Sequence, residues 1–444
     1  MNLKHALRIS ERSKVALVGA GGKTTTLFAL ARSLEGSVIL TNSAHLGRSQ
    51  AALADYHVIV ESREEVDEIF ASLGDGVTLI TGVERESGRL IGLTPDVLNQ
   101  VYSHAERLNL PVIIEADGSR MRPLKAPAEH EPPIPDWVDT VIVVCGLSGL
   151  GKPLNDSTVF RPEIFSQRAG LPLGQPVTPT ALIAYLLHPQ GGLKNIPQHA
   201  RRIVLFNQWD ECKPEDQTLL LQNVPLLHES YDAVVLGNVI HGGEDAVVAV
   251  YEPIAGIVLA AGASQRLGIP KQLLSWKGKP LIRWIVETAL GAHLSPVIVV
   301  VGAWIEPIQQ VLADLPVRIV VNPRWPNGVS TSVACGLEAL PKGVGGAVFL
   351  LSDQPYLSVE LIRALRDQHA HTLAPIVAPF VRGHRANPVL FDQVTFPALR
   401  QLQGDVGGRA IFGQFPVLPL EWFDERVLLD IDQPEDWEQV QRMG

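Results

Sequence analysis

Two stretches of this 444-residue chain share one design, in which an apolar β-branched run leads into a glycine-rich turn and then into a helical pattern. The first run is Val15–Gly19, with its turn at Ala20–Lys23 and a predicted helix over Thr24–Leu34. The second is Gly256–Ala260, with its turn at Ala261–Lys271. Such a strand, turn and helix form the opening βα unit of a parallel-sheet domain. The length also exceeds one ordinary core, so we expect two domains.

Further apolar runs follow each turn, and near-continuous runs of this kind suit parallel strands covered on both faces. Those after the first turn are Ser37–Leu40, His57–Val60, Val77–Ile80, Pro111–Glu115, Thr140–Val144, Arg202–Phe206 and Ala233–Val239. Those after the second are Pro296–Val301, Val317–Val321 and Gly346–Leu351. The boundary should fall near residues 248–255, which divides the chain into domains 1–250 and 251–444.

Composition excludes several classes of protein. Hydrophobic residues make up 46% and charged residues 19% of the chain, which is typical of a globular protein. The net charge of −10 argues against nucleic-acid binding. No apolar run is long enough for a membrane span, and the first residues lack the apolar core of a signal peptide. The three cysteines are far apart, so we expect neither a zinc site nor disulfides, and a cytoplasmic location.

The second turn has the composition of a triphosphate site. Small residues let backbone N–H groups approach phosphate oxygens, and the cations Arg266 and Lys271 supply positive charge. The alternative is a tight turn with two solvated charges. The candidate nucleotide contacts in the turn are Leu259, Ala260, Ala261, Gly262 and Ser264.

Acidic residues of the same half are candidates for holding Mg²⁺. Asp353 follows the apolar run Val348–Leu351, at the sheet edge where α/β domains bind ligands. Asp432 is the candidate for a second metal contact, and Asp430 could exchange roles with it. A turn cap before Pro355 is the alternative for Asp353, and a helix-entry cap is the alternative for the other two.

These features resemble the MobA/MocA-type nucleotidyltransferases, from about Ile254 to the C-terminus. The resemblance extends to Asn322–Ser332, Gly383–Val389, Gly404–Arg409 and Leu429–Asp436. It implies a Rossmann-like nucleotidyltransferase fold that transfers a nucleoside monophosphate and releases pyrophosphate. Ala260–Gly262 is similar to the cytidylyl type, so the implied reaction is Mg²⁺-dependent transfer of CMP from CTP to the molybdopterin cofactor.

The resemblance also implies roles for individual residues. Catalysis is implied for Arg266, Lys271 and Asp353, with Mg²⁺ on Asp353 and Asp432. The phosphate nucleophile is already ionised at neutral pH, so no general base is needed. By family position, the resemblance implies that Ser330 and Ser332 contact the nucleotide. It implies likewise that His384 and Asn387 contact the acceptor. Isoprenoid and sugar cytidylyltransferases share the opening motif, so an isoprenoid or sugar phosphate stays open as the acceptor.

The first turn has a shortened Gly-x-x-Gly-Lys-Thr pattern, which predicts a P-loop NTPase-like parallel sheet. Backbone amides and a helix N-terminus would hold the phosphates of ATP or GTP, with Lys23 pairing to them and Thr24 reaching Mg²⁺. A glycine-rich turn without phosphate is the alternative. The predicted contacts are Gly19, Gly21, Gly22, Lys23, Thr24 and Thr25.

Acidic residues follow a later strand of this half. Asp117 or Glu115 would hold the magnesium ion or orient a water molecule. The alternative is that they are acidic residues at the sheet edge that pair with Arg120 or Lys125. Asn207–Asp210 lies where a GTPase-like domain reads guanine, but Gln208 replaces the usual lysine, which leaves the base open.

The passage Glu115–Pro135 resembles the YqeC family, with a second matching block at Thr41–Gly47. The resemblance covers about residues 1–245 and implies an accessory role in maturing selenium-dependent molybdenum hydroxylases. An apo molybdenum hydroxylase is then an implied partner, and fusion of the halves would favour transfer of a labile cofactor. A cofactor chaperone without transferase activity is the second alternative.

Overall fold

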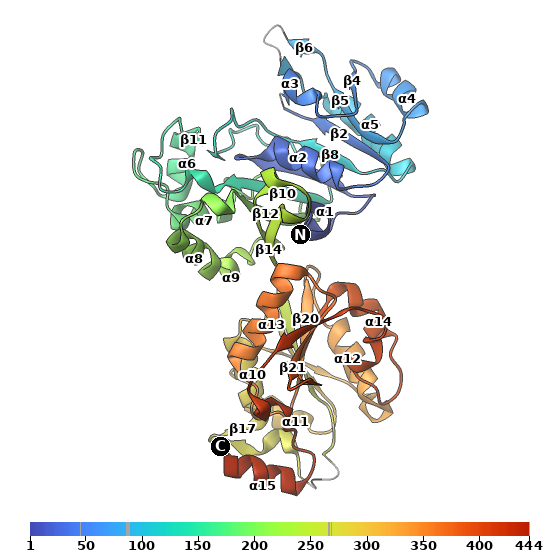
Figure 1. Cartoon of the computed structure of the whole chain (residues 1–444), viewed down its shortest axis with the longest axis vertical. Coiled ribbons are helices and arrows are strands. Elements are labelled where there is room, and N and C mark those ends of the chain that lie inside the picture. Colours follow the sequence, from blue (N-terminus) through green and yellow to red (C-terminus); the bar gives the residue numbers. More distant parts are fainter. Residues whose placement is uncertain (45, 86–88, 265–266, 268, 444) are drawn as a thin grey trace. The chain divides into compact units, whose positions relative to one another are not determined.

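The computed structural model describes residues 1–44, 46–85, 89–264, 267 and 269–443 (Figure 1). The chain divides into two compact units, Met1–Tyr251 and Glu252–Gly444. Both combine helices with a large sheet in which most neighbouring strands run parallel, so the predicted α/β class is confirmed. Within the described residues, no helix has the length and apolar character that a membrane crossing requires.

The first unit is built on a nine-stranded sheet with the order β14-β13-β12-β10-β1-β8-β2-β5-β4. All neighbours are parallel except β13 and β14, which are antiparallel. The strands are β1 (Lys14–Gly19), β2 (Ser37–Asn42), β4 (Tyr56–Ile59), β5 (Gly76–Thr81), β8 (Val112–Glu115), β10 (Thr140–Gly146), β12 (Arg201–Asn207), β13 (Ala233–Gly237) and β14 (Val247–Tyr251).

Helices and two small sheets complete this unit. The helices are α1 (Leu3–Leu7), α2 (Lys23–Arg32), α3 (Arg48–Ala51), α4 (Arg63–Ala71), α5 (Pro95–Arg107), α6 (Pro162–Ala169), α7 (Pro179–Leu187), α8 (Pro214–Gln222) and α9 (Val224–Leu227). A three-stranded sheet has the order β3 (Leu46–Gly47), β7 (Arg89–Leu90) and β6 (Glu84–Arg85), and β9 (Leu124–Lys125) pairs with β11 (Val159–Phe160).

The register of the large sheet brings several strand ends to one edge. Glu115 at the end of β8 lies beside Leu17 of β1 and Asn42 of β2. On the other side of β1, Gly146 of β10 lies beside Asn207 of β12. Because parallel strands end at a common edge, the loop that leaves β1 is surrounded by residues from distant parts of the sequence.

The second unit contains an eight-stranded sheet with the order β19-β18-β15-β20-β23-β21-β22, and β24 pairs with β21. The first four strands are parallel, whereas β23 is antiparallel to both of its neighbours. The strands are β15 (Ile254–Ala260), β18 (Val297–Val301), β19 (Arg318–Val321), β20 (Gly346–Leu351), β21 (Ile376–Val381), β22 (His384–Arg385), β23 (Val389–Asp392) and β24 (Val417–Glu421).

Alternating residues of β15 face two separate cores in this unit. Val258 packs in the cluster that contains residues of α10 and α13, while Ile257 packs with residues of α12 and α14. The sheet is therefore covered on both faces, as its apolar runs predict. The helices are α10 (Leu281–Gly291), α11 (Ile305–Leu312), α12 (Val329–Glu338), α13 (Val359–Thr372), α14 (Phe396–Arg400) and α15 (Pro434–Met443).

One expectation about the second unit is wrong. The first helix does not follow directly from the turn after β15, because the described residues of 261–270 are irregular. A short 3₁₀ turn (Lys271–Leu273) and a hairpin of β16 (Ser275–Trp276) and β17 (Lys279–Pro280) come before α10. The sequence after the small residues contains Pro270 and few apolar positions with helical spacing. It therefore favours an irregular loop over a helix.

Candidate functional site

The segment Gly19–Thr25, called here the glycine loop, runs from the last residue of β1 into the first turn of α2. Gly21 and Gly22 have φ of +75° and +120°, which L side chains rarely adopt. A Cβ on Gly21 would also lie 2.3 Å from the Cα of Gly146, so only glycine fits there. No side chain caps the N-terminus of α2. Its first amides are therefore left for a ligand, as at known phosphate sites.

Lys23 of the glycine loop is almost fully buried. Its ammonium donates to the carbonyl of Gly19 at 2.7 Å. It is also 3.2 Å from an oxygen of Asp117 and 3.8 Å from one of Glu115. The lysine thus has two carboxylate partners where the loop and the ends of β1 and β8 meet.

Thr24 and Glu115 are placed together at the same edge. The hydroxyl of Thr24 donates to Glu115 at 2.9 Å, and burial raises the pKa of the Glu115 carboxyl. Asp117 is arranged differently, because it lies between Lys23 and Lys125 and accepts a hydrogen bond from the amide of Gly19 at 3.2 Å. Of the two candidate acids, the structure brings Glu115 to Thr24.

A second charged group lies behind Asp117. Lys125 is 2.9 Å from both Asp117 and Glu131, and Arg161 binds Glu131 through two nitrogens at 2.6 and 3.1 Å. Burial works to raise the pKa of Glu131, but the hydrogen bonds from Arg161 and Lys125 outweigh it and lower the pKa to about 2. These ion pairs connect β9, the following loop and the residue that joins β11 to α6.

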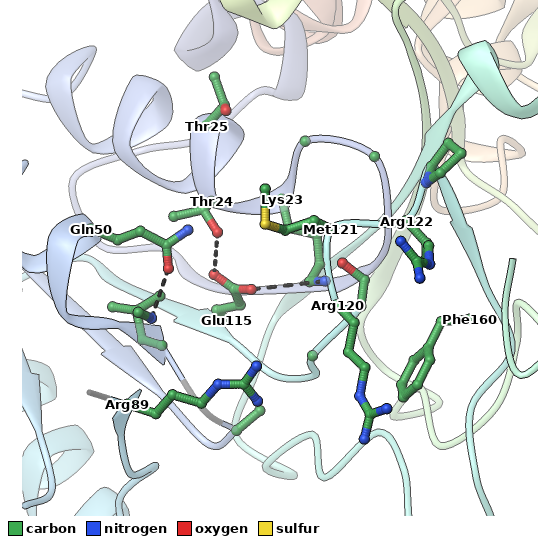
Figure 2. A pocket seen from close by; sticks show the side chains of 18 of the residues that line it. Lys23, Thr24, Thr25, Gln50, Arg89, Glu115, Arg120, Met121, Arg122 and Phe160 are labelled. Carbon is green, nitrogen blue, oxygen red and sulfur yellow. Dashed lines mark hydrogen bonds and ion pairs between the residues drawn. The ribbon is translucent and has the colours of Figure 1, made fainter. Parts of the chain in front are cut away.

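The glycine loop opens into a cavity of about 930 Å³ (Figure 2). Thr24, Thr25 and Glu115 line it, together with residues that were not predicted to belong to a site, including Arg89, Arg120, Arg122, Gln50 and Phe160. No spacing in the sequence marks those residues, because they come from β7, α3, β11 and the loop after β8.

Asn207 supports the glycine loop from β12. Its amide donates to the carbonyl of Gly21 at 2.8 Å, and its side-chain oxygen accepts from the backbone of Val239 at 3.0 Å. Gln208 has a φ of +63° and accepts a hydrogen bond from Ser148 at 2.9 Å. Gln208 and Ser148 both line the cavity. The Asn207 side chain therefore shapes the loop and leaves Gln208 on the cavity wall.

In the second unit, the turn after β15 is held by Gln272. This buried side chain donates to the carbonyl of Gly262 at 2.9 Å and accepts from the Ser264 hydroxyl at 3.3 Å. The same hydroxyl accepts a hydrogen bond from the backbone of Lys271 at 3.2 Å. Leu259 to Gly262 lie in the strand end and the irregular segment that follows it. Gln272 was not predicted, although it follows Lys271 directly.

Lys271 binds two of the predicted acidic residues. Its ammonium is 2.6 Å from Asp353 and 3.0 Å from Asp432. Burial works to lower the pKa of Lys271, but the two carboxylates outweigh it, so the pKa is raised. Three residues separated by 82 and 79 positions in the sequence thus meet at the edge of the sheet.

Asp430 lies beside this group without contacting Lys271. It accepts a hydrogen bond from Gln354 at 2.8 Å, while burial and the nearby charge of Asp353 raise its pKa to about 6. The other oxygen of Asp353 is buried and has no hydrogen-bond partner among the described residues. No cluster of three or more His, Cys, Asp or Glu side chains arranged to hold a metal was found in the described part of the chain.

The remaining predicted residues lie in different surroundings. Arg266 lies outside the described residues. Ser330 donates to the carbonyl of Gly404 at 2.7 Å, and Ser332 accepts from Asn322 at 3.0 Å, so both buried hydroxyls have partners within the fold. His384 is exposed at the start of β22. Asn387 lines a separate cavity of about 200 Å³ with Arg385, Arg409 and several apolar side chains.

Comparison with known families matches each unit separately. The family described as YqeC protein matches residues 15–163, and the MobA-like NTP transferase domain matches residues 256–417. The YqeC protein of Escherichia coli (strain K12) is 34% identical over 230 residues, which are 51% of this chain and 87% of that protein.

Two further relatives match shorter stretches of the chain. The nicotine blue oxidoreductase of Paenarthrobacter nicotinovorans is 32% identical over 194 residues, 41% of this chain and 93% of that protein. The purine catabolism protein PucB of Bacillus subtilis (strain 168) is 33% identical over 201 residues, 43% of this chain and 96% of that protein. The chain therefore belongs to the YqeC family through its first unit and is a nucleotidyltransferase of the MobA-like NTP transferase family through its second.

Proposed function

We propose that the second unit transfers CMP from CTP to a molybdopterin-type cofactor and releases pyrophosphate. The observation that carries this proposal is the contact of Lys271 with Asp353 and Asp432 beside the turn after β15. Transfer between two anions requires that their charge be neutralised and their atoms aligned. A cation held at a fixed point among small residues supplies both.

The acidic residues of this site fit a divalent metal ion. Asp353 keeps one buried oxygen without a hydrogen-bond partner among the described residues, and Asp432 is half exposed beside it. Carboxylate oxygens with free capacity are the ligands that Mg²⁺ prefers. Asp353 and Asp432 would hold the ion, which would supply charge neutralisation for the triphosphate. Lys271 keeps the two carboxylates near each other and would pair with phosphate oxygens.

CTP is favoured by the Ala260–Gly262 turn, which resembles the cytidylyl type. The molybdopterin acceptor is supported by the fusion to a YqeC-family unit, because the resemblance to that family implies an accessory role in maturing molybdenum hydroxylases. In the first unit, we propose that the glycine loop is a P-loop for ATP or GTP, with Lys23 on the phosphates and Thr24 with Glu115 at a magnesium ion. The last part of the proposal is that the nucleotide-bearing cofactor is transferred to an apo molybdenum hydroxylase.

The test is release of pyrophosphate with each of the four NTPs and molybdenum-loaded molybdopterin. We expect release with CTP, and loss of about 10²–10³-fold in rate for Lys271→Ala. The matched control is Lys342→Ala, an exposed lysine of the same unit that should leave the rate unchanged.

Two results would contradict the proposal. Transfer to methylerythritol phosphate or a sugar phosphate, with none to molybdopterin, would show that the acceptor is wrong. Tight cofactor binding without pyrophosphate release from any NTP would favour a chaperone over a transferase.

A further inference from the structure

The cavity of the first unit has two differently charged parts. In and directly behind the cavity wall, three cations are matched by three carboxylates, because Lys23 pairs with Glu115 and Asp117, Lys125 with Asp117, and Arg161 with Glu131. This inner group is electrically balanced. Any surplus charge in the cavity must therefore come from other residues that line it.

Three arginines form that surplus. We call Arg89, Arg120 and Arg122 the arginine rim; all three line the cavity, and none forms an ion pair or side-chain hydrogen bond with a described residue. Among the residues that the structure describes, the carboxylates that line the cavity are Glu115 and Glu131, and both are already paired. The rim thus gives this described lining a net positive charge.

Two members of the rim, Arg89 and Arg120, lie apart from the first residues of α2. Figure 2 shows Thr24 and Thr25 on one side of the Glu115 carboxylate and Arg89 and Arg120 on the other. The cavity of about 930 Å³ is near the upper end of the range for ligand pockets, about 300–1,000 Å³. It therefore has room beyond the phosphates that the glycine loop would hold.

Arg120 is held in position by its surroundings. Its guanidinium lies 5.0 Å from the centre of the Phe160 ring, which also contacts Arg161 at 4.3 Å. Arg120 and the adjacent Met121 have φ of 48° and 60°, the left-handed region that costs free energy for residues with side chains. The chain thus holds Arg120 at the cavity in a conformation that its local sequence does not favour.

We propose that the arginine rim binds a second anionic ligand, a phosphate ester, beside the nucleotide in the cavity. A guanidinium binds phosphate through two parallel hydrogen bonds, so three of them suit an ester with several oxygens. The charge of a triphosphate is already offset by its metal ion, the lysine and the helix N-terminus. Three further cations exceed that need and match a second anion. The inference rests on the proposed nucleotide site at Lys23.

The experiment measures inorganic phosphate binding to the full chain by titration calorimetry. The chain is first saturated with Mg²⁺ and a non-hydrolysable ATP or GTP analogue, so that the glycine loop is filled. We expect the double variant Arg89→Gln/Arg120→Gln to weaken phosphate binding by about tenfold or more, since it removes charge-assisted hydrogen bonds. Affinity for the analogue should change by less than about threefold.

Two further variants test whether phosphate binding depends on the hydrogen-bond geometry of Arg120 as well as its charge, and whether it depends on arginines of the cavity in particular. Arg120→Lys keeps the charge but loses the paired hydrogen bonds, so it should weaken phosphate binding less than Arg120→Gln. Arg63→Gln removes an arginine on α4, outside the cavity lining, and should leave both affinities unchanged. The site of the second unit is unchanged in every variant. Any phosphate that binds there therefore contributes equally to each titration and does not affect the comparison.

The outcomes distinguish this inference from the proposed function. If the wild-type chain does not bind the nucleotide analogue, the proposed nucleotide site fails and the inference fails with it. If the analogue binds but phosphate binding is absent or is unchanged in the double variant, the inference alone is wrong. A large loss of analogue affinity with unchanged phosphate binding would assign the arginine rim to the nucleotide.

Discussion

The ion pairs of Glu131 permit a quantitative prediction about stability. This side chain is 16% exposed, and it pairs with Lys125 and with both terminal nitrogens of Arg161. The substitution Glu131→Gln keeps its size and removes its charge. Among the described residues, it leaves Lys125 with Asp117 as its carboxylate partner and Arg161 with no carboxylate partner.

The magnitude follows from the pKa of Glu131, which falls from its ordinary 4.5 to about 2. At about 1.4 kcal/mol for each pH unit, the folded state gains on the order of 3 kcal/mol at pH 7. Because the folded pKa is depressed, this stability is fully present above pH 4.5 and is lost as the pH falls toward 2. At pH 3 the contribution is reduced to roughly 1.5 kcal/mol.

The assay is calorimetric unfolding of wild-type and variant chains at pH 7 and at pH 3. At pH 7 the transition of the first unit should fall by roughly 6–12 °C in Glu131→Gln, from about 2–4 °C per kcal/mol in a unit of this size. At pH 3 the difference should shrink by about half. The exposed neighbour Glu129→Gln is the control and should change little. A difference that stays constant between the two pH values would refute the ion-pair explanation.

Four further predictions concern the two candidate sites. Asp353→Ala should reduce CMP transfer by about 10²–10³-fold, and adding Lys271→Ala should cost little more, because the two act as a unit; additive losses in steady-state rates would contradict this. Lys23→Ala should abolish nucleotide-analogue binding in the first unit and leave CMP transfer unchanged, as equilibrium binding and pyrophosphate assays on one preparation would show. Gly22→Ala places a Cβ 2.2 Å from the Asn207 amide at a φ of +120°, so it should destabilise the first unit by roughly 1–3 kcal/mol in urea unfolding. Chelation of divalent metal should stop CMP transfer and added Mg²⁺ should restore it; full activity in chelator would exclude a metal role.

The strands that follow each turn were predictable because burial on both faces leaves a continuous apolar run in the sequence. Such runs coincide with β1, β8, β10, β15, β18 and β20. By contrast, β14, β21, β23 and β24 were not predicted from the sequence. Among them, β14 and β23 pair antiparallel with their neighbours, so they lie outside the parallel part of each sheet that continuous apolar runs predict.

The sequence by itself determined the local parts of each site. The spacing of Gly21, Gly22 and Lys23 dictates a turn that only glycine can form, followed by an uncapped helix. Small residues after β15 likewise determine where a backbone can approach a phosphate. These features depend on neighbours within a few residues, so they can be read directly from the sequence.

Only the tertiary structure decided which distant residues meet. It placed Asp353 and Asp432 on one lysine, and it brought Glu115, not Asp117, to the Thr24 hydroxyl. It also placed Arg89 of β7 on the same cavity as Arg120. The physical reason is that strand order and register set the sheet edge, and contacts across that edge join residues whose separation in the sequence carries no periodic signal.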